Sequence, residues 1–294
     1  ELLRDRSKCI IKVSMMNKIV EMVERFGIDK SKVREVPIPR YKYIMKEYEF
    51  DDVSIVSEEE ACVLDSKGIT VYMQIVGGLI WLTGVRIDII FATTYLSWST
   101  KAPRRHHLNM AMYCVSYLFS TIDVPLVLGG KGPFGVMTES DASLATGPKG
   151  RSVLGQITRL GPGAGAITAK ASASTVVHCS SFEAELDACS RSLKTVRYIS
   201  NIVKELGLDQ EQPIVYCDNE AMINFVKGEG VAKGVRHMEL RMWYTREQYR
   251  LGNAVVMWKS GETIAADKLT KLADKHSQRE FMYSVQGLHL LSEK

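Results

Sequence analysis

Residues 214–226 read IVYCDNEAMINFV, and this stretch decides how the second half of the chain folds. A run of apolar, β-prone residues ends at Asp218, and a helical pattern begins directly after it. A carboxylate at such a junction has two explanations, because it either caps the helix or holds a positively charged group such as a metal ion. The choice depends on whether other carboxylates converge on the same point.

The composition is that of a soluble globular protein. Of the 294 residues, 46% are hydrophobic and 24% are charged, and the length allows two ordinary domains. The longest apolar stretch, residues 72–85, is too short to span a bilayer. The net charge of +4 is compatible with a polyanionic partner. The six cysteines form no CxxC pair, which favours reduced thiols of an intracellular protein over disulfides or a zinc site.

The pattern of apolar residues divides the chain in two. In the first part we expect mostly helices, beginning with one over residues 9–27. In the second part, short β-prone runs separated by glycine-rich turns alternate with helices, the longest of them over 181–206. We therefore predict a mostly helical region at 1–130 and an α/β domain at 131–294.

Four acidic residues of the second part stand where acids are costly. Asp141 and Asp218 end strand-like runs, Glu185 lies beside the apolar face of a helix, and Asp267 begins another helix. Each has an ordinary explanation when taken alone: a helix cap for Asp218 and Asp267, a turn for Asp141 and a boundary position for Glu185. Four carboxylates in a small volume, however, repel one another unless a multivalent cation compensates. Oxygen ligands of this kind suit Mg²⁺ or Mn²⁺.

Several motifs, in this order, resemble the Pol polyprotein of copia-type (Ty1/copia) LTR retrotransposons. SSFEAELDA resembles the helix that carries the family's catalytic glutamate, and IVYCDNEAMI resembles the strand that ends in its YCDN motif. VRHMELRMWYTREQY resembles the family's basic helix, and AADKLTKL resembles its closing motif. In the first half, YMQIVGGLIWLTGVRIDIIFA is similar to the segment that follows the reverse transcriptase palm. The chain departs from the family at Ile87, where proline is usual, and in SDASLAT, where SDADWAGD is common. It contains no YxDD motif, so polymerisation is not assigned to it.

The resemblance implies an RNase H-like fold, with a mixed five-stranded sheet flanked by helices after a thumb- or connection-like region. It implies ribonuclease H activity, in which the RNA strand of an RNA–DNA hybrid is cleaved. Two Mg²⁺ ions about 4 Å apart would take part, with Mn²⁺ as a substitute. The implied catalytic residues and metal ligands are Asp141, Glu185, Asp218 and Asp267. The implied partners are the hybrid and the upstream polymerase part of the same polyprotein, in a cytoplasmic particle.

A basic segment is the candidate contact to the hybrid. A protein holds such a duplex through phosphates and 2′-hydroxyls rather than base edges. Ordinary ion pairing on a helix surface is the alternative. The residues that we expect to contact nucleic acid are Lys233, Arg236, His237 and Arg241.

A second hypothesis keeps the fold but not the chemistry. The chain starts without an initiator Met and lacks the palm, so we expect it to be a piece of a longer protein or a domesticated retroelement remnant. Such a remnant would be a non-catalytic structural or RNA-binding subunit of a larger host assembly. Retention of all four acids favours the enzyme, since a structural descendant has no physical need to keep them together.

Overall fold

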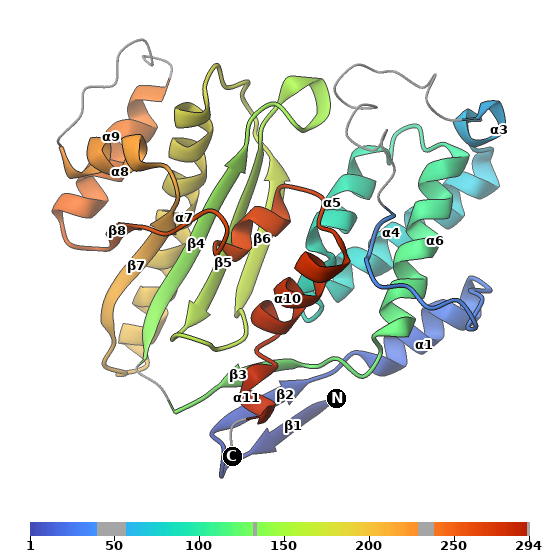
Figure 1. Ribbon diagram of the computed structural model, residues 1–294, viewed down its shortest axis with the longest axis horizontal. Helices are drawn as coiled ribbons and strands as arrows, with labels where there is room; N and C mark the ends of the chain where they lie inside the picture. The colour runs from blue at the N-terminus through green and yellow to red at the C-terminus, as the bar shows by residue number, and fades with distance from the viewer. Residues whose placement is uncertain (40–56, 132–133, 229–237, 293–294) are drawn as a thin grey trace. The chain divides into compact units, whose positions relative to one another are not determined.

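The computed structural model describes residues 1–39, 57–131, 134–228 and 238–292 (Figure 1). It divides into two compact units: Glu1–Leu128 together with Leu272–Lys294, and Gly129–Lys271. This division lies close to the boundary that we predicted from sequence. The last residues differ from the prediction, because the segment from Leu272 onward clusters with the first unit and not with the α/β unit.

The first unit combines helices with a small sheet. In this sheet the strand order is β1–β2–β3, and β1 pairs with β2 in antiparallel fashion. The predicted helix over residues 9–27 is wrong in its first part, because β-branched residues there form a strand and the helix begins only at Met16. The elements of this unit are β1 (Leu2–Asp5), β2 (Ile10–Val13), α1 (Met16–Arg25), α3 (Glu58–Ala61), α4 (Ser66–Leu82), η1 (Ile87–Ile89), α5 (Ile90–Trp98), α6 (Arg105–Ser120), β3 (Leu126–Gly129), α10 (Lys275–Val285) and α11 (His289–Ser292).

Buried polar contacts attach the C-terminal segment to the first unit. Gln278 on α10 donates from Nε2 to the backbone oxygen of Asp88 at 3.0 Å, and Gln286 donates to that of Val85 at 3.0 Å. The Asp88 carboxylate in turn receives Nε and Nη2 of Arg86 at 2.9 and 2.8 Å. Both residues of this ion pair are at most 2% exposed. The segment therefore satisfies buried polar groups of the first unit, which explains why it clusters there.

The second unit is built on a mixed five-stranded sheet. Its strands are β4 (Gly135–Ser143), β5 (Val153–Leu160), β6 (Thr168–Ala173), β7 (Glu211–Cys217) and β8 (Val255–Trp258), in the order β6–β5–β4–β7–β8. The first three strands pair in antiparallel fashion, whereas β7 and β8 run parallel to β4. This strand order and these directions are those of an RNase H-like fold and confirm the predicted sheet, with β4 at its centre.

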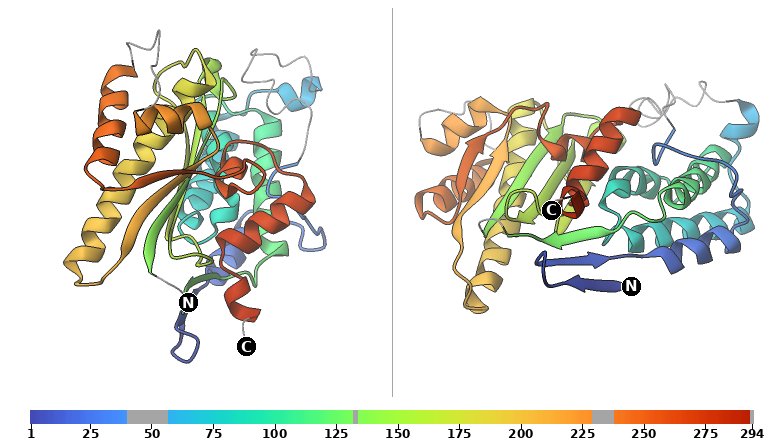
Figure 2. Two further views of the ribbon diagram at one scale, coloured as in Figure 1. Left: turned by 60° about the vertical axis from the view of Figure 1, so that its left-hand side comes forward. Right: turned by 60° about the horizontal axis from the view of Figure 1, so that its bottom comes forward.

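Helices cover both faces of this sheet. The long helix α7 (Ser181–Glu205) packs against β4, β5 and β7, and α9 (Glu239–Arg250) packs on its outer side (Figure 2). The short 3₁₀ helix η4 (Ala265–Leu269) packs on β4 and β5. Side chains alternate along a strand, and on β5 Gln156 bonds to Thr195 of α7 while Gly155 faces η4. Thus α7 and η4 lie on opposite faces. The remaining helical elements are η2 (Pro148–Gly150) and α8 (Glu220–Lys227).

Candidate active site

The central strand and its parallel neighbour bring two of the four acids together. In the register between β4 and β7, Glu139 is opposite Tyr216. Two residues further along, Asp141 on β4 comes level with Asp218, which directly follows β7. Asp141 is only 2% exposed, and its Oδ2 accepts a hydrogen bond from the Thr270 hydroxyl. The carboxyl end of two parallel strands thus supplies two carboxylates at one edge of the sheet.

Helix α7 contributes the third acid from its first turns. Glu185 is 5% exposed, and its Oε1 accepts a hydrogen bond from the backbone N–H of Ala142 at 3.1 Å. Its other oxygen, Oε2, is buried and has no hydrogen-bond partner among the described residues. An uncompensated buried carboxylate oxygen is costly, so it requires an explanation.

The fourth acid, Asp267, is carried by η4. Lys271 Nζ lies 2.5 Å from its Oδ1, and Lys268 Nζ lies 2.9 Å from its Oδ2. The helix can approach the sheet because residue 155, the partner of Asp141 on β5, is glycine. A Cβ atom on Gly155 would lie 2.9 Å from the backbone oxygen of Ala266, closer than side-chain carbons come to backbone oxygens.

A fifth acid, which sequence reasoning missed, fixes the start of η4. Glu139 precedes Asp141 by two residues on β4, so both side chains point to the η4 face. Glu139 accepts the backbone N–H of Ala265 at 2.5 Å and the ammonium of Lys259 at 2.7 Å. The sequence offered one signal for this role, since an acid in a central strand requires buried partners.

The acids interact electrostatically. Burial, and then the charges of Asp141 and Asp218, raise the pKa of Glu185 from 4.5 to about 9. Burial also raises the pKa of Asp141, outweighing the hydrogen bond from Thr270. For Asp267, burial acts in the same direction, but the hydrogen bonds and charges of Lys271 and Lys268 together outweigh it and lower its pKa. The charge of Asp218 acts on both Glu185 and Asp141, and the charge of Asp267 acts on Asp141, so like charges in this cluster affect one another.

The site can hold a divalent cation. Carboxylate oxygens of Glu185 and Asp218, together with the sulfur of Cys217, lie within 4.8 Å of one another. Burial raises the pKa of the Cys217 thiol, so the thiol stays protonated and is a poor ligand. The remaining donors are oxygens, and one of them is the unpartnered Oε2 of Glu185. An oxygen donor set of this kind fits Mg²⁺ or Mn²⁺.

The helix-cap explanation fails for two of the acids. Asn219, and not Asp218, is the N-cap of α8, with its Oδ1 accepting the backbone N–H of Met222 at 2.9 Å. The N-cap of η4 is Ile264, which makes no side-chain cap hydrogen bond. Room for the Asp218 carboxylate comes from Gly261, because a Cβ atom there would lie 2.8 Å from Asp218 Oδ2.

Of the four residues predicted to contact nucleic acid, three lie outside the described residues: Lys233, Arg236 and His237. The fourth, Arg241 on α9, donates from Nε to Asp187 Oδ1 at 2.8 Å. It is half-buried, so a role toward nucleic acid stays a prediction.

The sequence is similar to curated Pol polyproteins of plant transposons. It is 24% identical over 291 residues to the retrovirus-related Pol polyprotein from transposon TNT 1-94 of Nicotiana tabacum. The matched residues make up 98% of this chain and 21% of that polyprotein. It is 28% identical over 204 residues to the Pol polyprotein from transposon RE2 of Arabidopsis thaliana, 69% of this chain and 14% of that one. The chain thus spans about a fifth or less of the relatives it matches. The resemblance to copia-type Pol polyproteins holds across most of the chain. No family model matches the sequence.

Solved structures of RNase H domains match about half of the chain. LC11-RNase H1 in complex with an RNA/DNA hybrid has a TM-score of 0.36 and 17% sequence identity, covering 46% of this chain and 92% of that one. RNase H1 from the halophilic archaeon Halobacterium salinarum has a TM-score of 0.33 and 13% identity, and the match covers 49% of this chain and 98% of that one. The fold assignment itself rests on the strand order and directions in the second unit. No helix among the described residues combines the length and the apolar character needed to cross a membrane.

Proposed function

We propose that this chain is the ribonuclease H part of a copia-type Pol polyprotein and cleaves the RNA strand of an RNA–DNA hybrid. In this proposal the region before residue 131 corresponds to the connection between the polymerase and the nuclease. The upstream polymerase part and the hybrid are the partners, and a cytoplasmic particle is the setting.

One observation carries the proposal more than any other. The Oε2 atom of Glu185 is buried without a hydrogen-bond partner among the described residues, and burial together with the charges of Asp141 and Asp218 raises the pKa of this side chain to about 9. A purely structural cluster would gain stability by replacing such a group with an apolar or hydrogen-bonded one. Its presence is explained if a cation normally completes the site.

The chain's own residues would divide the work as follows. Asp141, Glu185, Asp218 and Asp267 hold the divalent cations, and Mg²⁺ is the expected species with Mn²⁺ as a substitute. When bound, a pair of such ions stabilises both the attacking and the departing oxygen of an in-line phosphodiester displacement. Glu139 keeps η4 at a fixed distance from β4 through its bond to the Ala265 N–H, which positions Asp267.

The experiment that tests the proposal compares the wild type with Asp218→Asn. The asparagine keeps the size of the side chain but removes a charge from the set of ligands. Cleavage of a hybrid with end-labelled RNA should fall by about three orders of magnitude or more, because several kcal/mol of transition-state stabilisation is lost. The matched control is Asp209→Asn, the same chemical change at an exposed residue of the second unit, which should leave cleavage unchanged.

The assay is run with Mg²⁺, with Mn²⁺ and with a chelator, at equal concentrations of folded protein. Single-stranded RNA, double-stranded RNA and double-stranded DNA serve as substrates for specificity. Metal-dependent cutting of only the RNA strand of the hybrid supports the proposal. If the wild type binds hybrid but cuts it with neither metal, the enzyme assignment is wrong and the domesticated, non-catalytic subunit is the better description.

A further inference from the structure

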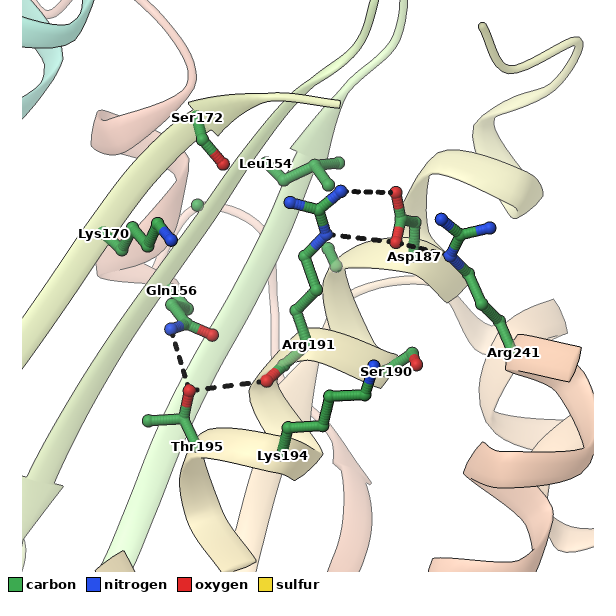
Figure 3. Close-up of a pocket in the computed structure, with 12 residues that line it drawn as sticks. Leu154, Gln156, Lys170, Ser172, Asp187, Ser190, Arg191, Lys194, Thr195 and Arg241 are labelled. Atoms are coloured by element: carbon green, nitrogen blue, oxygen red, sulfur yellow. Dashed lines mark hydrogen bonds and ion pairs between the residues drawn. The ribbon is translucent and has the colours of Figure 1, made fainter. Parts of the chain in front are cut away.

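A groove of about 360 Å³ lies on the α7 side of the sheet, outside the cluster of catalytic acids. We call it the α7 groove. Its floor is formed by β5 and β6 and its wall by α7, with one residue from α9 (Figure 3). The residues that determine its chemistry are Gln156, Lys170, Asp187, Arg191, Lys194 and Arg241.

The charge of the α7 groove is strongly positive. Four of its lining residues are cationic, namely Lys170, Arg191, Lys194 and Arg241, and one, Asp187, is anionic, so the net charge is 4 − 1 = +3. Neither lysine has a carboxylate partner among the described residues, and both are exposed. Like charges gathered around a concave surface repel one another, and a bound anion relieves that repulsion.

The single acid of the groove acts as an anchor for the two arginines. Asp187 is 1% exposed and receives Nε and Nη2 of Arg191 at 3.1 and 3.2 Å and Nε of Arg241 at 2.8 Å. Burial acts to raise its pKa, but the hydrogen bonds from His178 and Arg191 and the charges of the two arginines together outweigh burial and keep the pKa below the ordinary value. The carboxylate therefore stays ionised and holds both guanidinium groups in place.

This arrangement leaves donors directed at the groove. In Figure 3 the nitrogen of Arg191 that does not bond to Asp187 points toward the strands, and Lys170 extends from β6 toward α7. Neutral polar side chains complete the lining: Gln156 donates from Nε2 to the Thr195 hydroxyl at 3.0 Å. A guanidinium fixed by one carboxylate, with the Lys170 ammonium extending from the facing strand, is suited to a tetrahedral, multiply charged oxyanion.

We propose that the α7 groove binds a phosphate group. The phosphate has two possible sources, the backbone of a nucleic acid or free inorganic phosphate, and the groove chemistry is the same for both. The position favours the backbone, because Asp187 of the groove follows Glu185 by two residues on α7, so the groove begins next to the catalytic acids. This inference extends the proposed function but does not rest on it, since binding is measured without metal and without cleavage.

The test uses the double variant Lys170→Gln/Lys194→Gln. Both side chains are exposed, so the fold should persist. The control is Lys204→Gln, which removes an exposed lysine from the same helix about 15 Å further along. Binding of a labelled RNA–DNA hybrid is measured by fluorescence anisotropy in the presence of a chelator, from about 50 to 200 mM salt. Binding of inorganic phosphate is measured separately by calorimetry.

If the groove binds a phosphate of the nucleic-acid backbone, the double variant should flatten the slope of log affinity against log salt by about 1.5 to 2, and the control should leave it unchanged. If the groove binds free inorganic phosphate, the double variant should keep the wild-type salt slope. It should lose the phosphate binding that calorimetry detects in the wild type. Either result supports a phosphate site. If the double variant matches the wild type with both probes, or if the wild type binds neither, the inference is wrong. A protein that fails to cleave hybrid would leave these outcomes unaffected.

Discussion

Replacing Glu185 with glutamine should stabilise the metal-free protein and weaken its response to metal. In the folded protein the pKa of Glu185 is about 9, whereas its ordinary value is 4.5. The folded state therefore keeps a proton that the unfolded state releases. Below about pH 4.5 Glu185 is protonated in both states and does not change the free energy of unfolding. That free energy falls as the pH rises from about 4.5 toward 9.

The size of the effect follows from the same values. At pH 7 the solution is about 2.5 pH units above the ordinary pKa of 4.5, so the unfolded glutamate is ionised whereas the folded one keeps its proton. Each of these units favours the unfolded state by about 1.4 kcal/mol. The upper limit is therefore about 3.5 kcal/mol, and relaxation of the cluster lowers the expected effect to about 1–3 kcal/mol. Glutamine has no proton to release, its oxygen can still accept the Ala142 N–H, and its NH₂ group can donate to the neighbouring acids.

The assay is a denaturant titration read by hydrogen exchange of peptides from β4 and β7, which report on the second unit alone. It is run with a chelator at about pH 5, 6, 7 and 8. The gain of Glu185→Gln over the wild type should grow with pH. Glu205→Gln, at the exposed end of the same helix, is the control and should show no such trend. Adding Mg²⁺ should stabilise the wild type more than Glu185→Gln, since binding to the folded state adds to its stability.

Two results would refute this reasoning. A glutamine variant that is less stable than the wild type at every pH would show that Glu185 is compensated by the protein itself. A variant with the same response to Mg²⁺ as the wild type would show that this carboxylate is not a ligand.

Two further substitutions test the packing of each unit. Gly155→Ala should lower the unfolding free energy by about 1–3 kcal/mol and reduce hybrid cleavage, since its Cβ would collide with the Ala266 carbonyl and displace η4. Gly77→Ala, in an open helical position of α4, should not destabilise, and equal losses for the two would contradict the steric argument. Asp88→Asn should destabilise the first unit by about 3 kcal/mol or more, because asparagine is neutral and leaves the buried Arg86 guanidinium without its anionic partner. A thermal midpoint within about 1 °C of the wild type would contradict that.

Much of the second unit could be predicted from local pattern. The β-prone run ending at Asp218 is a strand, the helical pattern over 181–206 is α7, and the order of the elements yields the five-stranded sheet. These predictions succeeded because period and turn residues are local properties of the chain. The prediction failed at residues 10–13, where a short apolar run suits a helix and a strand equally well.

The candidate site was predictable as a list of acids but not as an arrangement. Sequence could not decide between Asp218 and Asn219 as the cap of α8, because capping depends on which side chain faces the first N–H groups of the helix. An acid in a central strand indicated that Glu139 needs buried partners, but the sequence did not identify η4 as that partner, or show that Gly155 lets η4 approach the sheet. These relations join residues more than a hundred positions apart.

By itself, the sequence determined the elements, their order and the resemblance to copia-type Pol polyproteins, since periodicity and motifs are written along the chain. Tertiary structure decided what those elements bring together. It brought Asp141 of β4 and Asp218, which follows β7, close to Glu185 of α7, whose Oε2 has no hydrogen-bond partner among the described residues. It also joined the last helices to the first unit and used Asp187 to hold Arg241 in a basic groove. The physical reason is that charge coupling and close packing depend on distance in space, which the spacing of residues along the chain does not specify.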